Sequence, residues 1–154
     1  MIIHFICRGN AFRSLMAEAY LNSLELKNVQ VISSGTVADE YRQSNDSHQV
    51  YQTTLAVLKS YGIDKFAKDH FGDQIEKDAY VPGDVVVCMN KVVYDELLNL
   101  TKKLPSLIRV WEIKDYGETS NQTGDRESIV RHQENTFPLI KNRVDDLVKE
   151  LNLQ

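Results

Sequence analysis

Four short apolar runs alternate along the chain with segments of helical periodicity, and this alternation limits the possible fold more than any other feature. The runs lie at 2–7, 29–33, 84–89 and 107–111. The first and third runs are almost continuously apolar, which is typical of strands buried in a parallel sheet. Strands that alternate with helices predict a parallel sheet with right-handed crossovers. We therefore expect an α/β protein with four parallel strands and helices on both faces.

Helical segments are expected between and after these strands. They are predicted from about 14 to 27, from 46 or 47 to 61, from 91 to 100, and from about 127 onward. Residues 37–47 are polar and are predicted as an irregular loop. Pro138 is expected to kink the last helix or to begin its second half. A chain of 154 residues is long enough for one domain, which we expect to span 1–154.

Composition excludes several classes of protein. The net charge is −4 and no basic cluster stands out, which argues against nucleic acid as the main partner. No apolar run approaches the length of a membrane span, and the first residues do not resemble a signal peptide. Cys7 and Cys88 fit a reducing compartment and supply neither a disulfide framework nor a metal-ligand cluster. We expect a cytoplasmic protein that needs no membrane, nucleic acid or metal.

The segment between the first strand and the first helix contains a nucleophile and an arginine at a distinctive spacing. Five residues separate Cys7 from Arg13, enough for the loop to curl once around a tetrahedral anion. Loop N–H groups, the positive end of the helix and the Arg13 guanidinium all favour the thiolate form of Cys7. Arg13 can also bind two oxygens of a phosphate. A thiolate beneath a bound phosphate is placed to attack phosphorus.

The remaining loop residues are expected to shape this phosphate site. Gly9 and Asn10 suit its tightest part, because both tolerate positive φ angles. Ser14 is predicted to donate its hydroxyl to the sulfur. The other predicted phosphate-binding residues are Arg8, Ala11 and Phe12. Cys7 taken alone is equally compatible with a buried strand cysteine, and the strand before it and the helix after it favour the active-site interpretation.

Residues 7–18 read C-R-G-N-A-F-R-S-L-M-A-E. This stretch resembles the signature of the low-molecular-weight protein tyrosine phosphatase family, C-x-G-N-x-C-R-S followed by P-M-A-E. Phe12 stands where the family has a second cysteine, and Leu15 stands where it has a proline. The resemblance extends over nearly the whole chain and implies the strand order 2-1-3-4 and catalysis without a cofactor.

The same resemblance implies a general acid after the fourth strand. Asp115-Tyr116 matches the family's D-P-Y segment without its proline, so we expect a looser loop. Asp115 is predicted to protonate the leaving oxygen, with Glu112 and Asp125 as weaker alternatives. Tyr116 is predicted to flank the substrate ring. Tyr41 either stacks against the substrate ring as a second aromatic side chain or is a half-packed tyrosine in a solvated connection.

Two further residues are implied as supporting the loop. Ser33 matches the first serine of the family's S-A-G-T segment, which binds the loop asparagine, here Asn10. From the residues alone, Ser33 is only a serine at a strand end. His70 lies where the family has a structural histidine, and we interpret it as structural.

The resemblance makes a protein tyrosine phosphatase the leading hypothesis, acting on a phosphotyrosine-containing protein or a small phosphomonoester. Three alternatives remain. Arsenate reductases share the fold but need further cysteines, and Cys88 is the only one available. Protein arginine phosphatases tend to carry threonine at the position of Ala11. A phosphate-binding module without turnover is suggested by Phe12, Leu15 and the missing proline.

Overall fold

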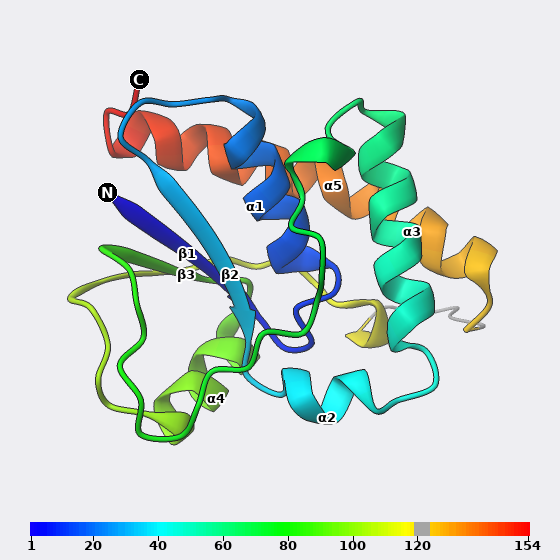
Figure 1. Ribbon diagram of the computed structural model, residues 1–154, viewed down its shortest axis with the longest axis horizontal. Coiled ribbons are helices and arrows are strands. Elements are labelled where there is room, and N and C mark those ends of the chain that lie inside the picture. Colours follow the sequence, from blue (N-terminus) through cyan, green and yellow to red (C-terminus); the bar gives the residue numbers. More distant parts are fainter. Residues whose placement is uncertain (119–123) are drawn as a thin grey trace.

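The computed structural model describes residues 1–118 and 124–154, and its centre is a parallel sheet. The strands pair in the order β2-β1-β3-β4, and every pairing is parallel (Figure 1). Their bounds are Ile2–Cys7 for β1, Gln30–Gly35 for β2, Val85–Cys88 for β3 and Leu107–Val110 for β4. The predicted fold class and strand order are therefore confirmed.

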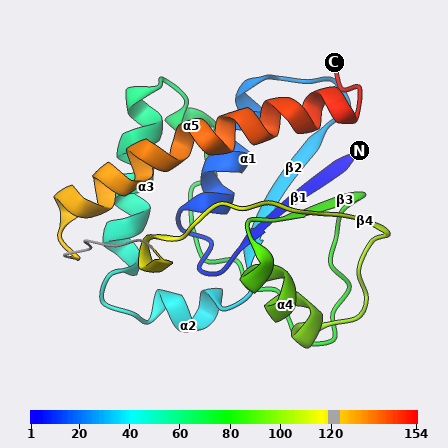
Figure 2. The same ribbon diagram turned by 180° about the vertical axis from the view of Figure 1, so that it is seen from behind.

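Helices cover both faces of the sheet. They are α1 (Arg13–Ser23), α2 (Ala38–Arg42), α3 (Ser47–Ser60), α4 (Lys91–Leu100) and α5 (Arg126–Glu150), with short 3₁₀ turns at Asp64–Phe66 and Tyr116–Glu118. Figure 2 shows the long α5 crossing α1. These two helices cover one face of the sheet, and α4 covers the other face. No helix within 1–118 or 124–154 is both long and apolar enough to cross a membrane.

The alternation of side chains along the strands explains this two-sided covering. Ile3 and Phe5 of β1 belong to the core shared with α1, α3 and α5. Ile6 of β1 and Cys88 of β3 belong to a second core with α4. Because successive strand residues point to opposite faces, Cys7 lies on the α1 side and Cys88 on the α4 side.

Some predicted boundaries are corrected by the structure. The first helix ends at Ser23, several residues before the expected end, and Glu25 and Asn28 follow with positive φ angles. Residues 37–47 contain the short helix α2 in place of an uninterrupted loop. The last helix begins at Arg126, because the Asp125 carboxylate accepts the backbone N–H of Ser128. It continues through Pro138 as one element.

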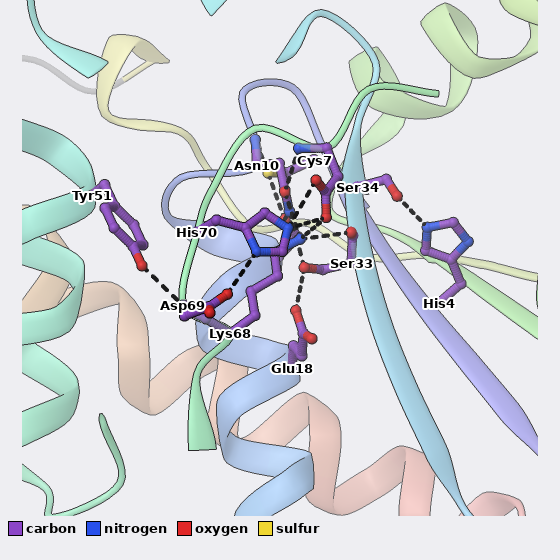
Figure 3. Close-up of polar contacts among 12 residues, drawn as sticks. His4, Cys7, Asn10, Glu18, Ser33, Ser34, Tyr51, Lys68, Asp69 and His70 are labelled. Carbon is purple, nitrogen blue, oxygen red and sulfur yellow. Dashed lines mark hydrogen bonds and ion pairs between the residues drawn. The ribbon is translucent and has the colours of Figure 1, made fainter. Parts of the chain in front are cut away.

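His4 is a buried polar side chain on the central strand, and its two ring nitrogens have different partners. Nδ1 lies 2.6 Å from the backbone oxygen of Pro82, which only accepts, so Nδ1 carries the proton. Nε2 then accepts from the Ser34 hydroxyl at 2.8 Å (Figure 3). Burial lowers the pKa of His4 to about 4. The folded protein therefore holds this imidazole neutral.

We expect His4 to make the fold sensitive to mild acid. Its folded pKa lies below the unfolded value of 6.5, so its contribution is complete above 6.5 and is lost as the pH falls toward 4. Between pH 7.5 and pH 5 this linkage should lower the free energy of unfolding by about 2 kcal/mol. Denaturant unfolding of the wild type and of His4→Gln at both pH values measures it. If the free energy of unfolding of His4→Gln falls equally between these pH values, the pH dependence does not come from His4.

Candidate active site

Cys7 is the last residue of β1, and its sulfur lies against the start of α1. Sγ is 3.0 Å from Ser14 Oγ and 3.3 Å from the backbone nitrogen of Asn10, which donates to it. Only 3% of the Cys7 surface is exposed, and it lines a pocket of about 100 Å³. The sulfur therefore sits at the floor of a small pocket with hydrogen-bond donors around it.

The start of α1 beside this sulfur is built to accept an anion. Phe12 occupies the N-cap position, no side chain among the described residues caps it, and the first turn contains no acidic residue. Helices usually begin with a serine, threonine, aspartate or asparagine that satisfies the first N–H groups. An anion in the pocket can take that role, because the helix end carries partial positive charge.

Arg13 and Asp115 meet at the same pocket although they are far apart in the sequence. The Arg13 side chain is almost completely buried, and its Nη1 donates to the backbone oxygen of Ile113 at 2.8 Å. Its Nη2 lies 3.5 Å from Asp115 Oδ2. Asp115 follows β4 and Cys7 ends β1, so the carboxyl ends of parallel strands bring them to one edge of the sheet. The structure thus brings together the three side chains predicted to be catalytic.

Gly9 and Asn10 have different roles from one another. Asn10 has a φ of 53°, in the range that asparagine was expected to tolerate, whereas Gly9 does not have a positive φ and does not use that freedom. Glycine is required at this position because a Cβ there would lie 2.6 Å from Cδ1 of the Tyr41 ring. Tyr41 therefore packs on the loop and lines the pocket, which favours its interpretation as a wall. Burial, followed by the charge of Asp115, raises the pKa of its hydroxyl.

Asn10 is the centre of a buried hydrogen-bond network. Its Nδ2 donates to Ser14 Oγ at 2.8 Å and to Ser33 Oγ at 3.0 Å. The Ser33 hydroxyl in turn donates to the buried Glu18 carboxylate, and desolvation raises the pKa of Glu18 despite that bond. The contact between Ser33 and Asn10 implied by the family resemblance is present in this structure (Figure 3).

The oxygen of the Asn10 amide has partners that sequence reasoning missed. It accepts from Lys68 Nζ at 2.8 Å and from the backbone N–H of Asp73 at 3.0 Å. His70 lies one step further out, where its ring contacts the carboxylates of Asp69 and Asp73. The hydrogen bond with Asp69, followed by that with Asp73, raises the pKa of His70. No motif marked Lys68, because its segment has no clear periodicity.

The other predicted site residues lie around the pocket. Arg8 and Ala11 line it, and the Arg8 guanidinium pairs with Glu96 of α4 at 2.8 Å, which raises its pKa. Tyr116 is not among the described lining residues, and its hydroxyl lies 2.9 Å from Ser128 Oγ. Its place beside the substrate ring stays a prediction.

His132 of α5 makes two aromatic contacts, one with the phosphate loop and one with the segment after β4. The His132 ring packs edge-on against both Phe12 and Tyr116.

The two alternative acids lie outside the pocket. Asp125 caps α5, and Glu112 is exposed outside the pocket lining. No cluster of three or more histidine, cysteine or acidic side chains that could hold a metal ion occurs in the described part of the chain.

Comparison with known proteins shows the family. The profile of the family described as low molecular weight phosphotyrosine protein phosphatase matches residues 2–154, so the chain belongs to this family. The predicted family is thereby confirmed. Arsenate reductase 1 of Staphylococcus epidermidis is 31% identical over 87 residues. That match covers 56% of this chain and only 58% of the relative.

Solved structures agree on the fold at lower identity. Vibrio vulnificus Wzb in complex with benzylphosphonate has a TM-score of 0.71 at 20% identity, with 97% of each chain covered. The YwlE arginine phosphatase, solved as a C7S mutant with a phosphorylated active-site serine, has a TM-score of 0.65 at 21% identity, again with 97% of each chain covered.

The contact between Gly9 and Tyr41 gives a test of the pocket wall. We expect Gly9→Ala to lower the free energy of unfolding by about 1–3 kcal/mol, because the added methyl group overlaps the ring. Gly117→Ala is the control, since no atom of the described residues lies within 4 Å of its Cβ position. In a Tyr41→Ala background the cost of Gly9→Ala should largely vanish, as a double-mutant cycle by denaturant unfolding measures. An unchanged cost in that background contradicts the contact.

Proposed function

We propose that this chain hydrolyses phosphomonoesters through a cysteinyl-phosphate intermediate on Cys7, with phosphotyrosine in proteins as the leading substrate. The observation that carries the proposal is the convergence of Cys7, Arg13 and Asp115 on one small pocket. A nucleophile, a cation for the phosphoryl oxygens and a carboxyl group for the leaving oxygen are the groups that this reaction requires.

In the first step the Cys7 thiolate attacks phosphorus, and the bond from phosphorus to the ester oxygen breaks. Asp115 gives its proton to that oxygen, so the alcohol or phenol leaves neutral. Loop N–H groups and Arg13 stabilise the charge on the other phosphoryl oxygens. Water then attacks the cysteinyl phosphate with Asp115 as the base, which releases inorganic phosphate and restores the thiolate.

The ion pair between Arg13 and Asp115 supports this cycle. The Arg13 guanidinium lies between the Ile113 carbonyl and the Asp115 carboxylate. A phosphate dianion competes with that carboxylate for Arg13. Substrate binding thereby releases the Asp115 carboxyl group from Arg13, so that it can act on the leaving oxygen.

The walls of the pocket favour an aromatic phosphoester. Apolar groups contribute much of its lining: Ala11, Phe12, Val37, Tyr41 and Val50. The Tyr41 ring is held flat against Gly9, which suits it to stack on a phenyl ring. The benzylphosphonate bound to the similar Vibrio protein is an aromatic phosphonate, which supports the same class of ligand here. We include a cytoplasmic location in the proposal, because both cysteines are unpaired.

The reductase alternative is less well supported than the phosphatase. It requires a second thiol that can reach an oxidised Cys7. Cys88 is completely buried in the core on the α4 side of the sheet, and desolvation raises its pKa to about 12. A disulfide needs converging Cβ directions, whereas these two side chains point to opposite faces.

The arginine phosphatase alternative is distinguished by the substrate. Phosphoarginine peptides and phosphotyrosine peptides assayed side by side show which of the two is hydrolysed.

We expect the purified protein to hydrolyse p-nitrophenyl phosphate and Cys7→Ser to abolish this turnover. Serine lacks the stabilised anion that attacks phosphorus, while the fold and the affinity for vanadate should survive. Cys88→Ala is the control and should keep activity, because Cys88 lies on the other face. Turnover in Cys7→Ser within about tenfold of wild type contradicts the assignment of the nucleophile. A wild type without turnover that still binds vanadate identifies a binding module.

Asp115→Asn should slow the hydrolysis of phenyl phosphate by roughly 10²- to 10⁴-fold, the usual contribution of general acid catalysis. The loss should shrink for esters whose leaving groups have low pKa values, because these depart without a proton. Steady-state kcat/KM for a series of aryl phosphates measures the trend. Glu112→Gln is the matched control, since that carboxylate lies outside the pocket lining. Equal impairment on every leaving group indicates a displaced loop.

A further inference from the structure

Lys68 lies outside the residues that line the pocket, and oxygen acceptors enclose its ammonium group (Figure 3). Nζ donates to Asn10 Oδ1 at 2.8 Å, to the backbone oxygen of Ser33 at 2.9 Å and to Asp73 Oδ2 at 2.8 Å. An ammonium group has three donors, so these contacts use all of them. Only 13% of the side chain is exposed. Lys68 is therefore a fixed positive charge.

A directed series of hydrogen bonds leads from this charge to the sulfur. Because lysine only donates, the Asn10 atom that it contacts is the amide oxygen, and the amide nitrogen faces Ser14. Ser14 Oγ accepts from that nitrogen, which leaves its own proton for Cys7 Sγ at 3.0 Å. Each donor in such a series is strengthened by the donor behind it.

We propose that Lys68 is a positioning residue for Cys7, stabilising the thiolate and fixing its direction through Asn10 and Ser14. The proposal rests on the proposed function, in which Cys7 is the nucleophile. The charged groups around Lys68 do not remove its effect. Asp73 is 47% exposed and screened by water, and Glu18 acts through Ser33. His70 contacts Asp73 on its outer side.

The pH dependence of Cys7 alkylation tests this role. Iodoacetamide is neutral and reacts with the thiolate, and peptide mass spectrometry separates Cys7 from the buried Cys88. Without the charge of Lys68, the alkylation midpoint of Cys7 should rise by about one pH unit in Lys68→Met. The acid limb of kcat/KM for p-nitrophenyl phosphate should move with it. Lys65→Met is the matched control, because Lys65 is exposed in the same segment and its ammonium group lies over the Phe66 ring, 5.1 Å from the ring centroid.

Lys68→Gln completes the design, because it keeps an amide donor for Asn10 and removes the charge. It should show the same rise, and it decides the question if Lys68→Met does not fold. The proposal is overturned if the Cys7 alkylation midpoints of the Lys68 variants lie within about 0.3 pH unit of that of Lys65→Met. The alkylation readout does not need turnover. A wild type that fails to hydrolyse the ester, with a midpoint that still depends on Lys68, overturns the proposed function and leaves the role of Lys68 intact.

Discussion

The buried amide of Asn10 is the interaction on which the site depends. Its oxygen accepts two hydrogen bonds and its nitrogen donates two, so its capacity is completely used. Leaving a buried polar group unsatisfied costs about 1–3 kcal/mol, and each alternative loop conformation breaks several of these bonds at once. The left-handed backbone at this position is held in place by that cost. With it, the Asn10 N–H and the Ser14 hydroxyl stay directed at Cys7.

The partners of Asn10 come from separate parts of the chain, so the site forms only when the fold does. Ser14 belongs to α1, Ser33 to β2, and Lys68 to the segment between α3 and β3. The same parallel sheet that brings β1 beside β2 also places the residues after β4 near the start of α1. One sheet edge therefore supplies the phosphate loop, its support and the carboxyl group opposite it.

The sequence was informative wherever the cause of a feature is local. Apolar runs and helical periodicity predict the strands and helices, and Asn10 is a residue that tolerates the left-handed backbone it adopts. The reason for glycine at position 9 could not be predicted locally, because the ring that packs against it comes from Tyr41 in another element. Lys68 had no local signal, since Asn10 and Ser33, two of its three partners, are distant in sequence. The family resemblance supplied the strand order and Asp115, which periodicity cannot give.

Burial explains how a chain with a net charge of −4 builds an anion site. Two of the cations near the loop, Arg13 and Lys68, are largely buried, and each has a carboxylate partner that is more exposed. The Arg13 side chain is 1% exposed and its partner Asp115 34%, while Lys68 and Asp73 are 13% and 47% exposed. Water screens the exposed carboxylates more than the buried cations. These two pairs therefore favour an anion in the pocket although their formal charges cancel. Net charge governs the encounter with distant partners, whereas burial governs which ion the pocket accepts.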